Sequence, residues 1–197
     1  NASGVAVLLA LAGRFARQPA ARWLRFVFFV NEEPPHFRTA AMGSRAYSEW
    51  AASDGELPEE VVVLDSVGFY ASVAGSQHFP SPRLTRLFGD RGDFVAFVGT
   101  SASEGLLLRV GGAFRASASL PSEGAVFALD IAGVAWSDHS SFWRHGVPAI
   151  LVTDTATFRD PHYHERTDSG DQIDLDALTR LTLGLEAALR APHAGSL

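Results

Sequence analysis

The sequence contains no cysteine and no lysine among its 197 residues. The absence of cysteine excludes disulfide bonds, thiolate nucleophiles and cysteine-ligated zinc sites. All sixteen basic residues are arginine, a bias that indicates a GC-rich, bacterial genome and carries no catalytic meaning. The net charge is −6 and no basic tract occurs, so we expect no nucleic-acid partner.

Long apolar runs and nucleotide-binding motifs are also absent. No run approaches the roughly 18 residues that a membrane-spanning helix needs, so we predict no membrane segment in this chain. Neither a G-x-G-x-x-G nor a Walker motif occurs, and there is no G-x-S-x-G elbow. The consecutive residues Ser137, Asp138 and His139 cannot form a catalytic triad, and we predict that Ser137 or Asp138 caps a short helix.

Apolar runs and amphipathic segments alternate along the chain, which predicts one α/β domain with an open, mostly parallel or mixed sheet between layers of helices. The composition, 47% hydrophobic and 19% charged, is typical of a globular domain. The predicted strands are residues 25–30, 61–64, 94–98, 125–129 and 148–153. The predicted helices are residues 2–16, 39–52, 80–88, 103–114, 137–145 and 175–190.

Acidic residues follow three of the predicted strands. The run at residues 26–30, Phe-Val-Phe-Phe-Val, predicts a strand buried on both faces, and Glu32 and Glu33 follow it after Asn31. Asp65 and Asp154 directly follow two later strands. Ligands of open α/β sheets gather at the carboxyl ends of strands, so these acids are candidate site residues. The local stretch alone slightly favours the interpretation of Glu32 and Glu33 as two solvated loop acids.

A polar loop at residues 158–171 carries His162, Tyr163 and His164. Carboxylates together with an imidazole form a ligand mixture suited to zinc or a similar divalent ion. A histidine in such a loop can equally be a hydrogen-bonding residue. The residues alone therefore leave both interpretations open.

Six segments, taken together, resemble the M28 family of zinc aminopeptidases. They occur in the family's order and cover nearly the whole chain up to Asp174: NASGVAVLLALA, VNEEPP, VLDSVGFY, DFVAFVG, SDHSSFWRHGVPAILVTDT and HYHERTDSGDQID. The resemblance implies a zinc-exopeptidase-like fold, two bound zinc ions and a peptide substrate with a free N-terminus. It also slightly favours a secreted or periplasmic location, while the sequence does not predict an oligomeric state.

The resemblance implies a role for each matching residue. Glu32 corresponds to the general base and acid, and Glu33 to a ligand of one zinc ion. His164 corresponds to a second ligand of that ion, and Asp65 to a ligand of the other. Tyr163 corresponds to a tyrosine that stabilises the oxyanion in some members.

The match also lacks parts of the family pattern. A further histidine ligand, the aspartate that bridges both metals and the first strands of the sheet would all precede Asn1. We therefore expect this chain alone to bind metal weakly and to have little peptidase activity. Two alternatives stay open: a glutaminyl-cyclase-like enzyme that uses one zinc ion, and a non-catalytic binding domain with the same fold.

Overall fold

The computed structural model describes residues 1–192 and is centred on a four-stranded sheet of order β1-β4-β2-β3. The pairs β1–β4 and β2–β3 are parallel, and the central pair β2–β4 is antiparallel, so the sheet is mixed. The strands are short and mostly apolar, as expected where helices cover both faces of a sheet. Their bounds are β1 (Val61–Leu64), β2 (Val95–Gly99), β3 (Ser122–Val126) and β4 (Ala149–Thr153).

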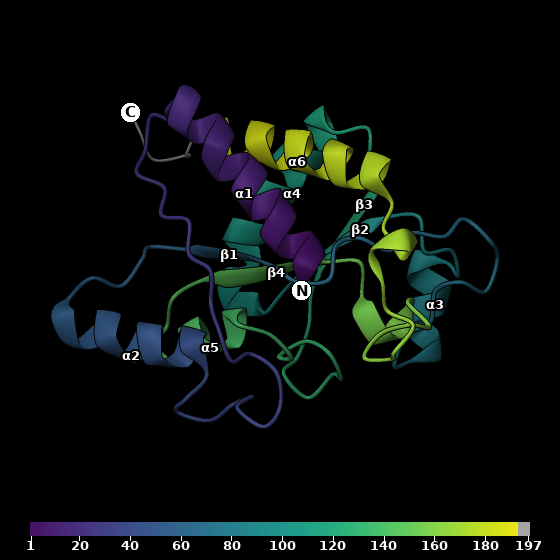
Figure 1. Cartoon of the computed structure of the whole chain (residues 1–197), viewed down its shortest axis with the longest axis horizontal. Helices are drawn as coiled ribbons and strands as arrows, with labels where there is room; N and C mark the ends of the chain where they lie inside the picture. The colour runs from purple at the N-terminus through teal and green to yellow at the C-terminus, as the bar shows by residue number, and fades with distance from the viewer. Residues whose placement is uncertain (193–197) are drawn as a thin grey trace.

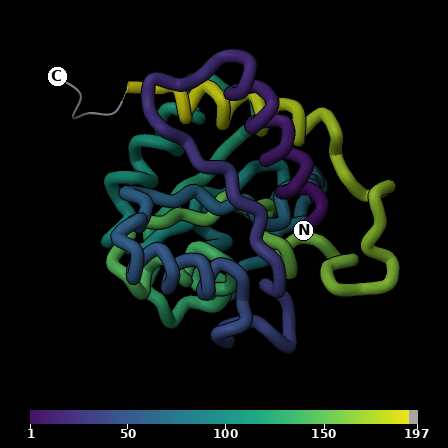
Figure 2. Tube along the Cα trace, turned by 60° about the vertical axis from the view of Figure 1, so that its left-hand side comes forward, coloured from purple at the N-terminus to yellow at the C-terminus, as the bar shows by residue number. Residues whose placement is uncertain are grey.

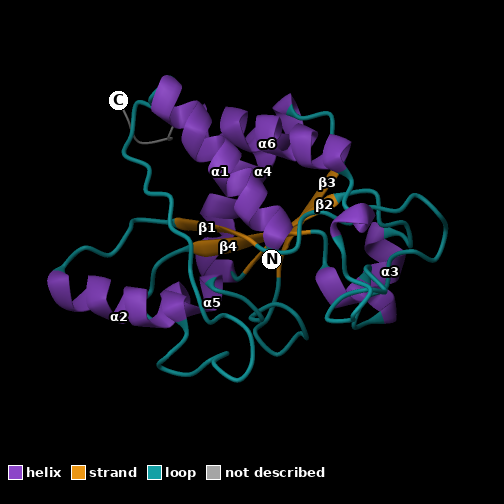
Figure 3. Cartoon of the chain, in the orientation of Figure 1, coloured by secondary structure: helices purple, strands orange, loops and turns teal. Residues whose placement is uncertain are grey.

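Three long helices cover one face of the sheet: α1 (Ala2–Arg17), α4 (Glu104–Ser117) and α6 (Leu175–Arg190). Figures 1 and 3 show them as a layer above the strands. Phe97 of β2 packs against Phe114 of α4, with ring centroids 5.2 Å apart. Leu181 and Leu185 of α6 are buried in the same core, which confirms the predicted apolar face of that helix.

Shorter elements cover the opposite face. At one end, α2 (Gly43–Asp54) and α5 (His139–Trp143) lie below the strands, where Phe142 packs against Ala149 in a small second core. At the other end lies α3 (Pro82–Phe88), separated from α2 by the width of the molecule (Figure 1). Because no long helix spans this face, its middle part is covered only by loops.

The connection between β4 and α6 is long and lies at the side of the molecule, as the yellow-green segment of Figure 2 shows. It contains two of three short 3₁₀ helices, whose bounds are Ser101–Ser103, Ala156–Phe158 and Gly170–Gln172. None of the helices in residues 1–192 is long and apolar enough to cross a membrane.

The prediction of a strand at residues 25–30, buried on both faces, is wrong. These residues run as an extended segment that pairs with no strand of the described chain. Phe28 is 44% exposed and Val30 is 68% exposed, while Phe29 packs on one side against Tyr47. An apolar run favours burial but does not supply a hydrogen-bonding partner, and a strand needs both.

The other predicted elements are present, with some boundaries shifted. The helix predicted from residue 39 begins at Gly43, because the preceding residues form turns and the Gly43 N–H donates to the Val30 carbonyl. The strand predicted at residues 125–129 is β3, which begins earlier and includes Gly124. A Cβ at that glycine would lie 3.3 Å from Leu107 of α4, so the strand and the helix pack closely there.

Candidate active site

The start of α1 is attached to the end of β1, directly beside Asp65. The Asn1 side chain caps the helix by accepting a hydrogen bond from the Gly4 N–H at 2.9 Å. The same oxygen accepts from the Ser66 N–H at 3.2 Å, and the Asn1 amide donates to the Leu64 carbonyl at 2.8 Å. One side chain therefore fixes the residues on both sides of Asp65.

The next residues of α1 strengthen this attachment. The buried Ser3 hydroxyl accepts a hydrogen bond from the Val67 N–H at 3.1 Å. A Cβ at Gly4 would lie 2.7 Å from the Leu64 carbonyl, so only glycine allows this approach of helix to strand. Ser66 itself has a φ of 48°, a conformation that side-chain-bearing residues rarely adopt outside well-supported sites. Asp65 is thus held on a rigid support.

Asp154, at the end of β4, links two loops of the site and does not face its centre. Its buried carboxylate accepts one hydrogen bond from the Phe69 N–H and another from the Ala156 N–H, both at 2.8 Å. Burial raises the pKa of Asp154 to about 7, against the lowering effect of these bonds and of Arg159. The segment after Asp65 is therefore joined to the segment after β4.

Arg159 continues this link and is almost fully buried. Its guanidinium donates to the Gln77 side-chain oxygen at 2.7 Å and to the Phe94 carbonyl at 2.8 Å. The rings of Phe94 and Tyr70 lie 4.6 Å and 5.6 Å from the guanidinium carbon. Because Arg159 is so enclosed, it anchors the base of the loop that continues to Tyr163 and His164.

Glu33 and His164 meet across the site although 131 residues separate them in the sequence. The His164 Nε2 lies 3.2 Å from a Glu33 carboxylate oxygen, and both side chains are about half exposed. The Tyr163 ring stacks on the His164 ring, with centroids 4.0 Å apart and planes 14° from parallel. His164 has a φ of 61°, again an unusual backbone conformation at a candidate site residue.

Three further carboxylates influence one another beside this pair. Burial raises the pKa of Glu32 to about 8, with added repulsion from Asp65, Asp138 and Glu33. Burial also raises the pKa of Asp138 to about 6, and Asp65 contributes to that rise. The pKa of Asp65 is raised for the same reason. Among the five residues to which the resemblance assigns roles, Glu33 and Asp65 act electrostatically on Glu32, these three carboxylates act on Tyr163, and His164 contacts Glu33.

Asp138 is a residue of this cluster that sequence reasoning missed. We predicted that it or Ser137 caps a short helix, but no side chain caps the five-residue α5. The Asp138 carboxylate instead interacts with Glu32 and Asp65. A lone acid before a short helix carries no sequence signal of this role, because the chain folds back on it from residues far away.

The Glu33–His164 pair fits part of a zinc coordination sphere. Two ligand atoms at 2.0–2.1 Å from a tetrahedral zinc ion lie about 3.3 Å apart, close to the separation of this pair. The donor types, one imidazole and one carboxylate, also suit zinc. Within residues 1–192, however, no group of three or more His, Asp or Glu side chains converges as a metal site. The described residues thus supply fewer than the three protein ligands of a catalytic zinc ion.

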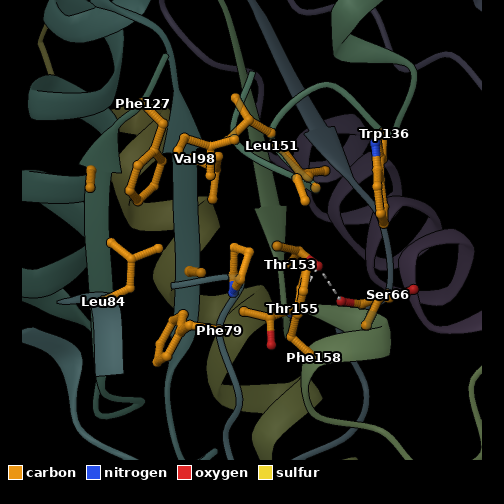
Figure 4. Close-up of a pocket in the computed structure, with 18 of the residues that line it drawn as sticks. Ser66, Phe79, Leu84, Val98, Phe127, Trp136, Leu151, Thr153, Thr155 and Phe158 are labelled. Atoms are coloured by element: carbon orange, nitrogen blue, oxygen red, sulfur yellow. Dashed lines mark hydrogen bonds between the residues drawn. The ribbon is translucent and has the colours of Figure 1, made fainter. Parts of the chain in front are cut away.

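An apolar pocket lies against the strands β2 and β4, whose residues Val98, Leu151 and Thr153 line it (Figure 4), and its lining includes Asp65 and Tyr163. Its cavity volume is about 120 Å³. The Thr153 hydroxyl in its wall donates to the Ser66 carbonyl at 3.1 Å. The walls are mainly apolar and include Phe79, Leu84, Val98, Phe127, Trp136, Leu151 and Phe158.

The sequence model of one protein family, described as Peptidase family M28, matches residues 1–188. The chain belongs to this family. Family membership and the α/β fold predicted from the sequence are thereby confirmed, and members of peptidase family M28 are in general zinc-dependent. The segments that predicted the family include those that build the site around Asp65 and His164.

The relatives of this M28 domain include proteins of known structure. The chain is 35% identical over 189 residues to the "Uncharacterized protein YfbL" of Escherichia coli K12, covering 94% of this chain and 56% of that protein. An aminopeptidase from Aneurinibacillus sp. strain AM-1 has a TM-score of 0.63 and 25% identity, over 96% of this chain and 38% of its own. LapB from Legionella pneumophila has a TM-score of 0.69 and 18% identity, and the match covers 96% of this chain and 46% of LapB. The chain thus spans about half the length of these proteins or less.

Proposed function

We propose that this M28 domain is part of the catalytic unit of a zinc-dependent aminopeptidase, which removes the N-terminal residue of a peptide. The observation that carries the proposal is the meeting of Glu33 and His164 next to Tyr163, which together with Asp65 lines an apolar pocket. Metal-ligand side chains and a pocket for a substrate side chain are the two parts that such a reaction needs. The family, a family of peptidases, supports a peptide substrate.

In this proposal, Glu33 and His164 hold one zinc ion and Asp65 is a ligand of a second. When bound, zinc supplies Lewis-acid polarisation of the scissile carbonyl and of the attacking water. The rigid support of Asp65 fixes one ligand position, while the half-exposed Glu33 and His164 supply two ligand side chains from loops.

Glu32 acts as the proton carrier. It accepts a proton from the attacking water and delivers it to the leaving amine. The half-buried position of Glu32 next to Glu33 and near Asp65 supports this role, because it places a carboxylate beside the proposed zinc ligands. Tyr163 donates a hydrogen bond to the carbonyl oxygen as it becomes negative. Burial raises the pKa of Tyr163 to about 12, which keeps the phenol protonated for this purpose.

Kinetics and metal analysis of the intact natural polypeptide test the proposal. We expect release of the aromatic amine from aminoacyl anilides in the presence of zinc. Glu32→Gln should lower kcat by at least about 100-fold while the zinc content stays unchanged. Glu33→Gln should lower the zinc content, whereas Glu59→Gln, at an exposed position before β1, should change neither. Full activity of the Glu32 variant would exclude the proposed role.

A single-zinc enzyme that cyclises N-terminal glutamine is the second candidate. It is favoured by the fact that Glu33 and His164 contact each other, whereas no group of three or more possible metal ligands converges within residues 1–192. Glutaminyl anilide separates the two reactions, because a peptidase releases the aromatic amine whereas a cyclase releases ammonia and keeps the anilide bond. A non-catalytic binding domain would give neither product and would lose its metal on dialysis.

A further inference from the structure

The apolar pocket is lined by only two charged side chains among the described residues, Asp65 and Glu123. Asp65 directly follows β1, the strand at one side of the sheet. Glu123 belongs to β3, the strand at the opposite side of the sheet from β1. The two carboxylates therefore belong to opposite sides of the sheet, and the lining between them is mainly apolar.

The register of the sheet places these two carboxylates in one row. Ala96 of β2 pairs with Glu123 on one side and with Thr153 of β4 on the other. Leu64 pairs with Val152, so Asp65, the next residue, stands level with Thr153. Paired residues point to the same face of a sheet, which is here the face that forms the pocket floor. Three strand spacings of about 4.8 Å put about 14 Å between the backbones of Asp65 and Glu123.

The carboxylate of Glu123 has no hydrogen-bond or ion-pair partner within the part of the chain that the structure describes. It is half-buried, and the neighbouring Gly124 faces α4 on the other side of the sheet, so the Glu123 side chain lies on the pocket side. A partly desolvated carboxylate without a cation is unfavourable, and a cationic ligand would remove that cost.

We propose that Glu123 makes this pocket selective for peptides whose N-terminal residue is basic. The proposal rests on the proposed aminopeptidase function, in which the scissile carbonyl lies beside Asp65. An extended arginine side chain reaches about 7 Å from its Cα, and lysine slightly less. The length of the Glu123 side chain and one hydrogen bond of about 2.9 Å account for the rest of the about 14 Å between the backbones of Asp65 and Glu123.

The remaining lining suits the stem of such a side chain. The methylene groups of arginine or lysine would lie along Val98, Leu151 and the rings of the opposite wall, while the charged end reaches the carboxylate. A leucine side chain would occupy only the near part of the pocket and leave Glu123 unpaired. An acidic side chain would meet a like charge, which disfavours it.

Matched substrates and matched variants of the intact protein test the proposal. Citrulline has nearly the shape of arginine but no charge, so the ratio of kcat/KM for arginine anilide over citrulline anilide isolates the contribution of the charge. We expect a ratio of about ten or more in the natural protein, since hydrogen bonds to charged groups discriminate on this scale even when partly solvated. Glu123→Gln should bring the ratio close to one, through KM, and leave leucine anilide turnover unchanged. Glu59→Gln should leave every value unchanged.

The outcomes also separate this proposal from the proposed function. Turnover of leucine anilide with an arginine-to-citrulline ratio near one, or a ratio that survives Glu123→Gln, would overturn the role of Glu123 and leave the aminopeptidase intact. Absence of turnover with every anilide would overturn the aminopeptidase, and calorimetric binding of argininamide then decides the role of Glu123. Tighter binding of argininamide than of citrullinamide, lost in Glu123→Gln, would support it, and equal binding would overturn it.

Discussion

Asp65 and Glu33 are carboxylates of one candidate site, but the molecule supports them in opposite ways. Asp65 leaves the central sheet, and its neighbours are held by the side chains of Asn1, Ser3 and Asp154. Glu33 lies in a series of turns, where its half-exposed carboxylate meets the half-exposed His164. One half of the site is therefore part of the packed domain, and the other half is built on loops.

Because of this difference, we expect substitutions in one half of the site to change the stability of the fold and substitutions in the other half to change ligand binding. The half around Asp65 shares its hydrogen bonds with the start of α1 and the end of β4, so changes there disturb the fold. The half around Glu33 and His164 contributes little buried area or buried hydrogen bonding, so changes there should act mainly on bound ligands. Loops placed on a rigid scaffold often carry function in this way.

The largest expected effect is on the stability of the packed half. Arg159→Met removes the buried guanidinium that holds Gln77 and the Phe94 carbonyl, and it leaves the Asp154 carboxylate without its nearby cation. We expect the free energy of unfolding to fall by about 3–5 kcal/mol, the range for breaking a buried charged network. Urea denaturation followed by circular dichroism measures this change.

Arg166→Met provides the matched control, since Arg166 is exposed on the same loop. It should change the free energy of unfolding by no more than about 0.5 kcal/mol, as is usual for surface positions. An equal loss in both variants would show that the packed half of the site extends further along the loop than its contacts indicate.

A pH dependence of stability is expected from His139, which follows Asp138 and is fully buried. Burial lowers the pKa of His139 to about 4, while its Nε2 contacts the Val134 carbonyl at 2.7 Å. Between pH 6.5 and pH 4 the unfolded chain binds a proton that the folded chain does not, so the stability contributed by neutral His139 is lost as the pH falls. Between pH 7 and pH 4.5, the free energy of unfolding of the His139→Gln variant should therefore fall by about 2–3 kcal/mol less than that of the natural protein. Urea denaturation of both proteins at the two pH values checks this difference. An equal fall in the free energy of unfolding of both proteins would contradict it.

A smaller effect is expected where α1 meets the end of β1. Ser3→Ala leaves the buried Val67 N–H without its acceptor, which should cost about 1–2 kcal/mol. Ser53→Ala is the control, because the exposed Ser53 hydroxyl bonds only to its own helix. Thermal unfolding of the two variants should differ accordingly, and an equal change would mean that Ser3 is dispensable for the rigid support of Asp65.

Local signals allowed the packed elements to be predicted. Residues 61–64 form a strand and Leu175–Arg190 a helix with the predicted bounds, because an apolar run and a 3.6-residue spacing are properties of the segment itself. The helix is also capped locally, since the Asp174 carboxylate accepts from the Ala177 N–H at 2.8 Å. Glu33 and His164 were singled out as an acid after an apolar run and an imidazole in a polar loop, and the family resemblance assigned them to one zinc ion. The structure brings them together.

Features that depend on partners far along the chain could not be predicted in this way. The apolar run at residues 26–30 has the composition of a buried strand, but no described strand pairs with it. Asp138 joins the carboxylate cluster only because β1 and α5 lie side by side. Likewise, Glu123 enters the pocket row because β4 lies between β1 and β2, an order that no local pattern encodes.

The smallest expected change in stability concerns the loop half of the site. His164→Gln and Glu33→Gln each break the contact between two half-exposed side chains, and such exposed pairs contribute no more than about 0.5 kcal/mol after allowance for solvent screening. We expect the urea midpoints of both variants to match that of the natural protein without metal. Their zinc affinity, measured by competition with a chromogenic chelator, should nevertheless fall by at least about tenfold, the size of effect seen when groups at a metal site are removed. A destabilised variant with unchanged zinc affinity would reverse the comparison, because it would place Glu33 and His164 in the packed half and remove them from the metal site.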